Sequence, residues 1–229
     1  DYQVLIGDTD NNNLNEIIVE NSNELVKFEW QQKKYIKKVL SKFSKNRPKK
    51  IVSSEDENYL ITRDYRNWIK FNLWGEKEYK IDRKLAVQSN EGYRLQISDI
   101  DNDQQQELIM TAYNGNKTYT IKIYTLEGEL KYKFAREYGP QVVTVDLDQD
   151  KINEIFLHSN DKQQSNLFVF EWDGITYDLK WKTSLEQMKI VDLASGDINN
   201  DNQQELIVLA VKDNKSKIYI YQPNNNRYN

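Results

Sequence analysis

One nine-residue acidic segment occurs four times in this chain, and each copy is followed directly by two apolar residues. The copies are DTDNNNLNE at 8–16, DIDNDQQQE at 99–107, DLDQDKINE at 146–154 and DINNDNQQE at 197–205. Carboxylate or amide side chains fall at alternate positions of each copy, and the ninth residue is always glutamate. A polar turn that enters an apolar pair is typical of a loop leading into a β-strand. Its recurrence constrains the chain to a repeat architecture.

The spacing of the copies predicts five units. They begin at residues 8, 99, 146 and 197, so the last two intervals are 47 and 51 residues, and the first, 91, is close to two such periods. A degenerate copy is therefore expected near residue 54. The segment at 50–62 has the flanking strand patterns with a shortened loop that has lost the ligand spacing. The expected units are residues 1–46, 47–90, 91–138, 139–187 and 188–229, all within a single domain, 1–229.

Each unit has the pattern of four short strands. In the third unit these are residues 93–98, 107–113, 118–124 and 130–134, with Asn-Gly and Glu-Gly turns between the later pairs. A second echo, LVKFEW at 25–30 against LFVFEW at 167–172, lies outside the acidic loops. The pattern favours an all-β fold, a β-propeller of about five four-stranded blades, over a stacked solenoid, because a radial array protects its edge strands. The last unit ends after a third strand, at 217–221, so the chain is expected to have an incomplete last blade and to be part of a larger ring.

Composition narrows the function classes. The 229 residues include no cysteine and one histidine, which excludes disulfide scaffolds, thiolate metal sites and a histidine-based catalytic triad as the organising feature. The formal net charge of -4 provides no basic field for nucleic acid. A nucleic-acid partner is therefore not expected. No apolar run approaches the roughly 18 residues that a membrane helix needs, so direct membrane insertion is not expected either.

The acidic loops predict hard-cation sites. Oxygens at positions 1, 3 and 5, a backbone carbonyl at position 7 and the glutamate at position 9 can supply six or seven ligands, which is the coordination that Ca²⁺ prefers. Up to four Ca²⁺ ions are therefore expected. The ligand residues are Asp8, Asp10, Asn12, Leu14 and Glu16; Asp99, Asp101, Asp103, Gln105 and Glu107; Asp146, Asp148, Asp150, Ile152 and Glu154; and Asp197, Asn199, Asp201, Gln203 and Glu205.

Two other interpretations of the loops compete with this one. An EF-hand needs a glutamate at position 12, where this chain has Val19, Met110, Leu157 and Val208, so that motif is excluded. The loops could instead be solvated Asx-rich turns that hold no ion. Fourteen of the 36 acidic residues lie at ligand positions, and such crowding without a counterion is unfavourable.

The loops and the FEWDG stretch at 170–174 resemble the calcium-binding repeats of the FG-GAP and VCBS type, known from integrin α-subunit propellers and bacterial surface proteins. The resemblance covers essentially the whole chain. It implies a β-propeller, usually with seven blades, and calcium between the first two strands of a blade. It also implies an extracellular or cell-surface role in adhesion, with a periplasmic or luminal location as the alternative. The family usually has glycine at loop position 6, where this chain has Asn13, Gln104, Lys151 and Asn202. Left-handed backbone there costs Gln and Lys about 1 kcal/mol.

The expected function is non-enzymatic: a calcium-stabilised module that presents a surface to a protein or glycan partner. One alternative is a carbohydrate-active enzyme, a polysaccharide lyase or glycosidase, with Arg63, Arg66, Arg94 and Arg136 as the first basic candidates. Another is a structural subunit of a larger surface assembly. Trp68, Trp74 and Trp181 are candidates for a stacking surface, and His158 is expected to have a packing role. No catalytic residues are predicted, and the basic stretch 42–50 is expected to be a solvated connection between blades.

Overall fold

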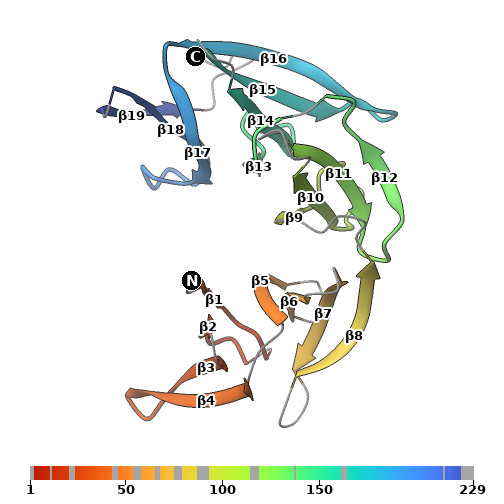
Figure 1. The fold of residues 1–229 in the computed structure, drawn as a ribbon, viewed down its shortest axis with the longest axis vertical. Coiled ribbons are helices and arrows are strands. Elements are labelled where there is room, and N and C mark those ends of the chain that lie inside the picture. Colours follow the sequence, from red (N-terminus) through yellow and green to blue (C-terminus); the bar gives the residue numbers. More distant parts are fainter. Residues whose placement is uncertain are drawn as a thin grey trace. The chain divides into compact units, whose positions relative to one another are not determined.

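The computed structural model describes residues 3–10, 12–20, 24–42, 46–53, 58–64, 68–74, 79–86, 93–113, 119–136, 138–160, 164–213 and 215–222. It divides into two compact units, Asp1–Asn90 and Glu91–Asn229. In both units the elements of the described residues are β-strands, joined by turns and short loops (Figure 1). The described part of the chain contains no helix long and apolar enough to cross a membrane.

The first unit contains two four-stranded antiparallel sheets. One has the order β1-β2-β3-β4 and the other β5-β6-β7-β8. Their strands are β1 (Gln3–Gly7), β2 (Glu16–Glu20), β3 (Glu24–Gln31), β4 (Lys34–Lys42), β5 (Asn46–Ser53), β6 (Asn58–Asp64), β7 (Trp68–Trp74) and β8 (Tyr79–Ala86).

The second unit contains three sheets. Their orders are β9-β10-β11-β12, β13-β14-β15-β16 and β17-β18-β19. Their strands are β9 (Tyr93–Ser98), β10 (Glu107–Tyr113), β11 (Tyr119–Thr125), β12 (Leu130–Lys133), β13 (Val142–Val145), β14 (Glu154–Asn160), β15 (Gln164–Trp172), β16 (Tyr177–Glu186), β17 (Lys189–Gly196), β18 (Glu205–Lys212) and β19 (Lys215–Tyr221).

The sheets are the blades of a β-propeller, which confirms the predicted fold class. Every sheet is formed by strands consecutive in sequence, and the innermost strands of successive sheets lie side by side: β1 contacts β5 in the first unit, and β13 contacts both β9 and β17 in the second (Figure 1). As the sequence predicts, the last sheet of the described residues has three strands. The acidic segments join the first and second strands of four blades.

The core of each blade follows from strand periodicity and from the cover that a neighbouring blade provides. In β14, side chains on both faces are buried, because its blade packs against β9–β12 on one side and the last blade on the other, all within the second unit. One apolar cluster links β13–β16 to the last blade and includes Phe156, Val169 and Val208. A second, more aromatic cluster links β9–β12 to β13–β16 and includes Phe134, Tyr138 and Phe170. The space between blades is therefore filled by side chains of both.

The expectation that the basic stretch 42–50 connects two blades was wrong for its second half. Strand β5 begins at Asn46 and pairs with β6 up to Asp64, so the second half of that stretch is the first strand of a blade. The register shifts between Pro48 and Lys50. Proline has no N–H to donate to a neighbouring strand, and such a bulge accommodates it within a sheet. The degenerate loop expected near residue 54 lies at 54–57, outside the described residues, and β5 and β6 flank it.

Candidate metal loops

The four acidic loops share one backbone conformation, with a left-handed residue at position 6. The φ angles are 64° for Asn13, 69° for Gln104, 79° for Lys151 and 67° for Asn202. This is the position where the resembled family has glycine, so the expected left-handed geometry is present although the glycine is not. The same hydrogen bonds hold the conformation in each copy.

The aspartate at position 1 anchors the loop. Its Oδ2 atom accepts a hydrogen bond from the backbone N–H of position 6 at 2.8–3.0 Å in all four copies. The side-chain oxygen at position 5 accepts from the N–H of position 7 at 2.7–2.9 Å. These bonds curl nine residues into a turn that gathers the side chains of positions 1, 3 and 5 on one side.

The glutamate at position 9 is buried in every copy and closes the loop from the other end. One of its carboxylate oxygens accepts a hydrogen bond from the backbone N–H of position 2, at 2.8 Å for Glu16, 3.1 Å for Glu107, 2.7 Å for Glu154 and 2.9 Å for Glu205. Burial raises the pKa of Glu16 and of Glu107 above the ordinary glutamate value, against the lowering effect of these hydrogen bonds. A buried carboxylate with a raised pKa needs a nearby positive charge to remain ionised comfortably.

Buried oxygens that accept no hydrogen bond test whether a cation fits. Among the described residues, Oδ1 atoms of Asp10, Asp99, Asp101 and Asp146 are buried and have no hydrogen-bond donor. All four belong to loop positions 1 and 3. A buried carboxylate oxygen without a partner is destabilising, and a bound cation would satisfy it. The side chains therefore fit a divalent cation.

The carboxylates are also close enough to share one ion. Groups whose ligand atoms lie within 4.8 Å of one another are Asp8, Asp10 and Glu16; Asp99, Asp101 and Glu107; Asp146, Asp148 and Asp150; and Asp148, Glu154 and Glu171. In each of three loops, three of the predicted carboxylate ligands are thus brought together. The Asp197 loop forms no group of three such carboxylates within the described residues, and its third position is the amide Asn199.

Two of the loops already receive an ammonium group from a neighbouring strand. In the Asp8 loop, Nζ of the fully buried Lys27 lies 2.8 Å from Oδ2 of Asp10 and 2.8 Å from Oε1 of Glu29. In the Asp99 loop, Nζ of Lys131 lies 2.7 Å from Oδ2 of Asp101 and 2.8 Å from Oε1 of Glu107. Both lysines reach the carboxylate at position 3.

The other two loops differ. Among the described residues, no ammonium group lies within ion-pair distance of Asp146, Asp148 or Asp150, and burial together with the charge of Asp150 raises the pKa of Asp148. In the Asp197 loop, the Nδ2 atom of Asn199 donates to Oδ2 of Asp201 at 3.0 Å and to Oε1 of Glu205 at 2.9 Å. An amide therefore faces the carboxylates there.

Sequence reasoning about the loops missed Lys27, Lys131 and Glu171. They come from strands β3, β12 and β15, so spacing within the loop carries no information about them. The similarity of segments 25–30 and 167–172 could have indicated Glu171, because Glu29 and Glu171 occupy the same position in the two segments. Segment 25–30 has the charged Lys27 at the position where segment 167–172 has the apolar Val169.

The aromatic and arginine candidates are only partly described. Trp181 packs against the core of the second unit and Tyr221, so it is not a free stacking surface. Trp68 is partly exposed, and the side chain of Trp74 lies outside the described residues. A pair missed by the sequence analysis is more exposed: Trp30 and Tyr35, in edge-to-face contact at 5.0 Å between ring centroids, are 46% and 52% accessible at the end of the β3–β4 hairpin.

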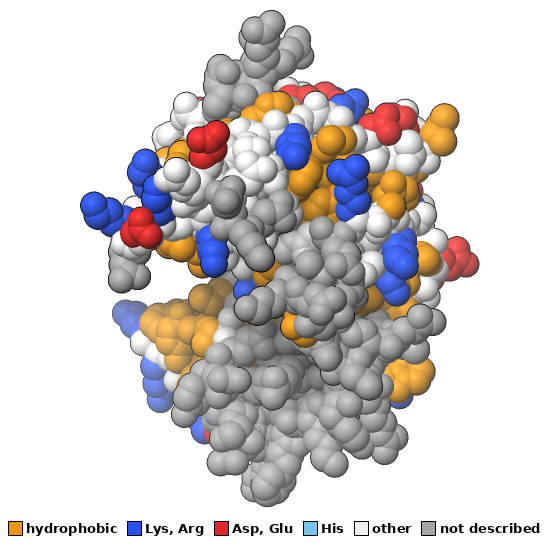
Figure 2. Space-filling view, turned by 45° about the horizontal axis from the view of Figure 1, so that its top comes forward, with side chains coloured by type: hydrophobic (Ala, Val, Ile, Leu, Met, Phe, Trp, Pro, Cys, Tyr) orange, Lys and Arg blue, Asp and Glu red, His pale blue; other side chains and the backbone are white. Residues whose placement is uncertain are grey.

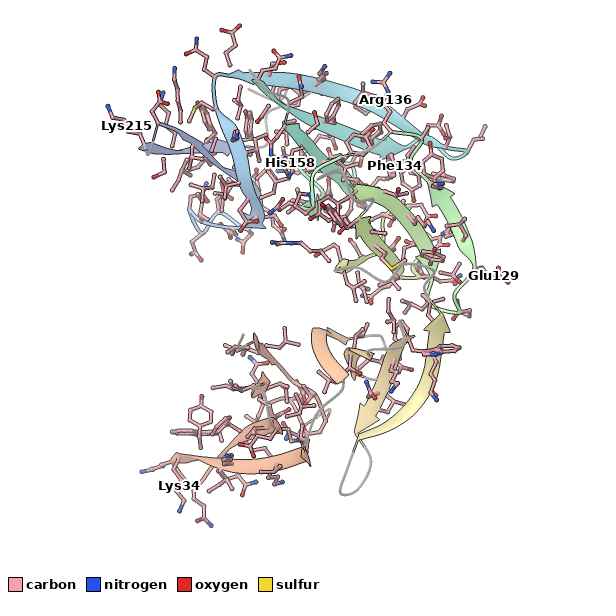
Figure 3. All side chains as sticks on the ribbon, viewed as in Figure 1. Lys34, Glu129, Phe134, Arg136, His158 and Lys215 are labelled. Atoms are coloured by element: carbon pink, nitrogen blue, oxygen red, sulfur yellow. The ribbon has the colours of Figure 1, made fainter. Side chains whose placement is uncertain are left out.

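The arginines do not form a described catalytic cluster. Arg94 lies 4.0 Å from Asp192, with both side chains more than half exposed, and Arg136 follows β12 near the outer side of the second unit (Figure 3). Arg66 and the side chain of Arg63 lie outside the described residues. His158 is buried within the second unit, as the packing role predicts (Figure 3).

Neighbouring loops are connected. The side-chain Nδ2 of Asn153, at position 8 of the Asp146 loop, donates to the backbone carbonyl oxygen of Asp99 at 2.6 Å. The start of one acidic loop is thus hydrogen-bonded to the end of the next, across two blades.

Comparisons with known proteins identify the fold alone. No family model matches the chain, and no curated protein matches it. A similar solved structure is BBS1N in complex with ARL6DN, with a TM-score of 0.60 and 12% identity over 96% of this chain and 67% of that chain. Exotype rhamnogalacturonan lyase YesX aligns with a TM-score of 0.47 and 11% identity over 90% of this chain and 48% of that chain. The likeness to BBS1N agrees with the β-propeller fold described above.

Proposed function

We propose that the chain is a calcium-stabilised propeller of the FG-GAP/VCBS type that presents a binding surface to a protein or glycan outside the cytosol. The observation that carries the metal part is the set of buried, donor-free aspartate oxygens at positions 1 and 3 of the loops. Calcium would satisfy these oxygens and join the first two strands of a blade. The need is greatest in the Asp146 loop, because Asp10 and Asp101 of the other loops already pair with Lys27 and Lys131. At the millimolar concentrations of extracellular fluids even a weak site is filled, and the folded state gains stability by mass action.

Surface chemistry favours a protein or glycan over a nucleic acid. On the face drawn in Figure 2, the Lys and Arg side chains that are shown stand among Asp, Glu and hydrophobic side chains rather than forming one broad basic field. The exposed pair Trp30 and Tyr35 offers flat aromatic faces, which suit sugar rings and protein hot spots. BBS1N, which has a similar fold, was solved in complex with ARL6DN, and this is a precedent for partner binding by the fold.

Thermal unfolding with and without calcium tests the metal part. The midpoint should be several degrees higher in millimolar Ca²⁺ than in EDTA, and Asp146→Asn combined with Asp148→Asn should remove much of that difference. The matched control is Asp178→Asn, an exposed aspartate on β16. Equal midpoints in Ca²⁺ and EDTA for the unmodified chain would reject calcium stabilisation.

A binding screen tests the partner part. The chain is applied to a glycan array and to immobilised candidate surface proteins in Ca²⁺, and hits are repeated with Trp30→Ala and Tyr35→Ala. Binding that weakens about tenfold or more in either variant supports this surface. Binding unaffected by both variants places the contact elsewhere, and turnover of a bound glycan would favour the enzyme alternative.

A further inference from the structure

Two lysines, Lys27 and Lys131, contact carboxylates at the candidate metal positions. Lys27 is a lysine with a fully buried side chain, and it extends from β3 into the Asp8 loop. A buried ammonium group is unfavourable unless it is paired with carboxylates. Its partners are Asp10 and Glu29, one from the loop and one from its own strand, both within 2.8 Å.

Lys131 reaches an equivalent place by a different route. It comes from β12, the fourth strand of its blade, and its Nζ contacts Asp101 and Glu107, with Asp103 at 3.7 Å. These are the carboxylates of positions 3, 9 and 5, which a calcium ion would bridge. A cation cannot take these oxygens without displacing the ammonium group, and two positive charges so close together repel.

The Asp146 blade provides an internal comparison. Glu154 is the first residue of β14, as Glu16 is of β2. Two residues later, Phe156 pairs with Val169 and Ile18 pairs with Lys27, so Val169 and Lys27 occupy equivalent positions. Val169 cannot neutralise a carboxylate. Glu171 nevertheless has the place of Glu29, and its carboxylate lies within 4.8 Å of ligand atoms of Asp148 and Glu154. Each of these two glutamates also pairs with a lysine of the fourth strand, Glu171 with Lys180 at 2.7 Å and Glu29 with Lys38 at 2.6 Å. The same acidic arrangement therefore lacks its inner lysine here.

We propose that Lys27 and Lys131 replace the metal ion in the Asp8 and Asp99 loops, and that the Asp146 loop is the principal calcium site, with Glu171 as a ligand from outside the loop. This inference rests on the proposed calcium function and limits it to particular loops. In the Asp197 loop, the Asn199 side chain can rotate to present its oxygen, so that loop binds calcium more weakly. The native chain then binds no more than two ions instead of four.

Counting bound ions tests the proposal. Isothermal titration with Ca²⁺ and native mass spectrometry of the whole chain should give at most two ions. Lys131→Met, which keeps a long apolar side chain, should add one ion and make the thermal midpoint more dependent on Ca²⁺. Glu171→Gln should weaken the tightest site about tenfold or more. The matched control is Lys133→Met on the same strand, which should leave the count unchanged.

The outcomes separate this inference from the calcium function on which it rests. Three or four ions in the unmodified chain, or no gain in Lys131→Met when the unmodified chain binds calcium, would overturn the lysine proposal and leave calcium stabilisation standing. No binding to the unmodified chain but one ion in Lys131→Met would support the replacement of the metal by Lys131, and it would overturn the Asp146 calcium site together with calcium in the native loops. No binding to either would reject both. If Lys131→Met unfolds in EDTA, its recovery in Ca²⁺ supports the proposal, and failure to recover opposes it.

Discussion

The imidazole Nε2 of His158 lies 2.8 Å from Oε1 of Gln141, and the amide nitrogen of that glutamine donates to the carbonyl oxygen of Val191 at 2.8 Å. This chain of contacts runs from β14 to β17, through the space between two blades. With Oε1 as the acceptor, Nε2 carries the proton. The histidine is therefore part of the connection between blades, and its charge state affects that connection.

The stability of the second unit should depend on pH through His158. Burial lowers its pKa to about 4, with Asp192 raising it and Arg94 lowering it slightly. Between pH 6.5 and pH 4 the unfolded chain binds the proton and the folded chain does not, so stability is full above about 6.5 and is lost as the pH falls. The loss is on the order of 3 kcal/mol. Urea unfolding at pH 7 and pH 4.5 measures it.

The variant His158→Gln separates this effect from the carboxylates that titrate in the same range. It keeps a donor toward Gln141 and removes the titrating group, so its stability should change less between the two pH values. Parallel losses in both proteins would show that the histidine is not the cause.

Replacement of Gly139 by alanine should destabilise the second unit. A Cβ atom there would lie 2.1 Å from Cε1 and 2.2 Å from Nε2 of His158, too close for any side-chain atom. The ring is held by its contact with Gln141, so the expected loss is roughly 1–3 kcal/mol or more. The control is Gly196→Ala, where an added Cβ meets nothing within 4 Å, and the change should lie within about 1 kcal/mol of zero. Comparable losses in both would contradict the clash.

Lys151→Asn should stabilise the Asp146 loop. Lysine holds φ at 79° there, and asparagine tolerates this left-handed region better, so a gain of up to about 1 kcal/mol is expected. Lys151→Ala removes the same charge and keeps the strain, so it distinguishes backbone from electrostatic effects. Chemical denaturation in EDTA measures both variants, and an equal gain in the two would attribute the effect to charge.

Thr9→Val should weaken the closing contact of the Asp8 loop. The Thr9 hydroxyl donates to Oε2 of Glu16 at 2.6 Å, and the backbone N–H of the same residue donates at 2.8 Å. Valine retains only the second bond, and a hydrogen bond to a charged group contributes roughly 1.5–3 kcal/mol. The other three loops have Ile or Leu at this position. A double-mutant cycle with Glu16→Gln measures the coupling, and additive effects would show that the hydroxyl bond contributes nothing.

Local pattern specified most of the fold. The strands expected at 93–98 and 107–113 have those bounds in the structure, because period-two alternation and the acidic turn both mark their ends. The start of the strand at Asn46 was missed because the basic stretch falls at the end of the first unit, and the bulge that accommodates Pro48 is not visible in the sequence. The left-handed residue at position 6 was predictable from the family resemblance, but the left-handed residues at position 4 of three loops, Asn102, Gln149 and Asn200, were not. The lysines were not: Lys27 and Lys131 meet their carboxylates through pairing between strands, over 17 and 30 residues.

The hydrogen bond from Asn153 to the carbonyl of Asp99 has a consequence for how the second unit opens. Blades of a propeller can unfold locally and independently of one another when they contact each other only through side-chain packing. A bond from one loop to the backbone of the next makes their fluctuations cooperative, so β9–β10 and β13–β14 should form one unit of local unfolding. In native-state hydrogen exchange the amides of these two hairpins would then share a single opening free energy, so that the cooperative element in this part of the second unit spans two blades.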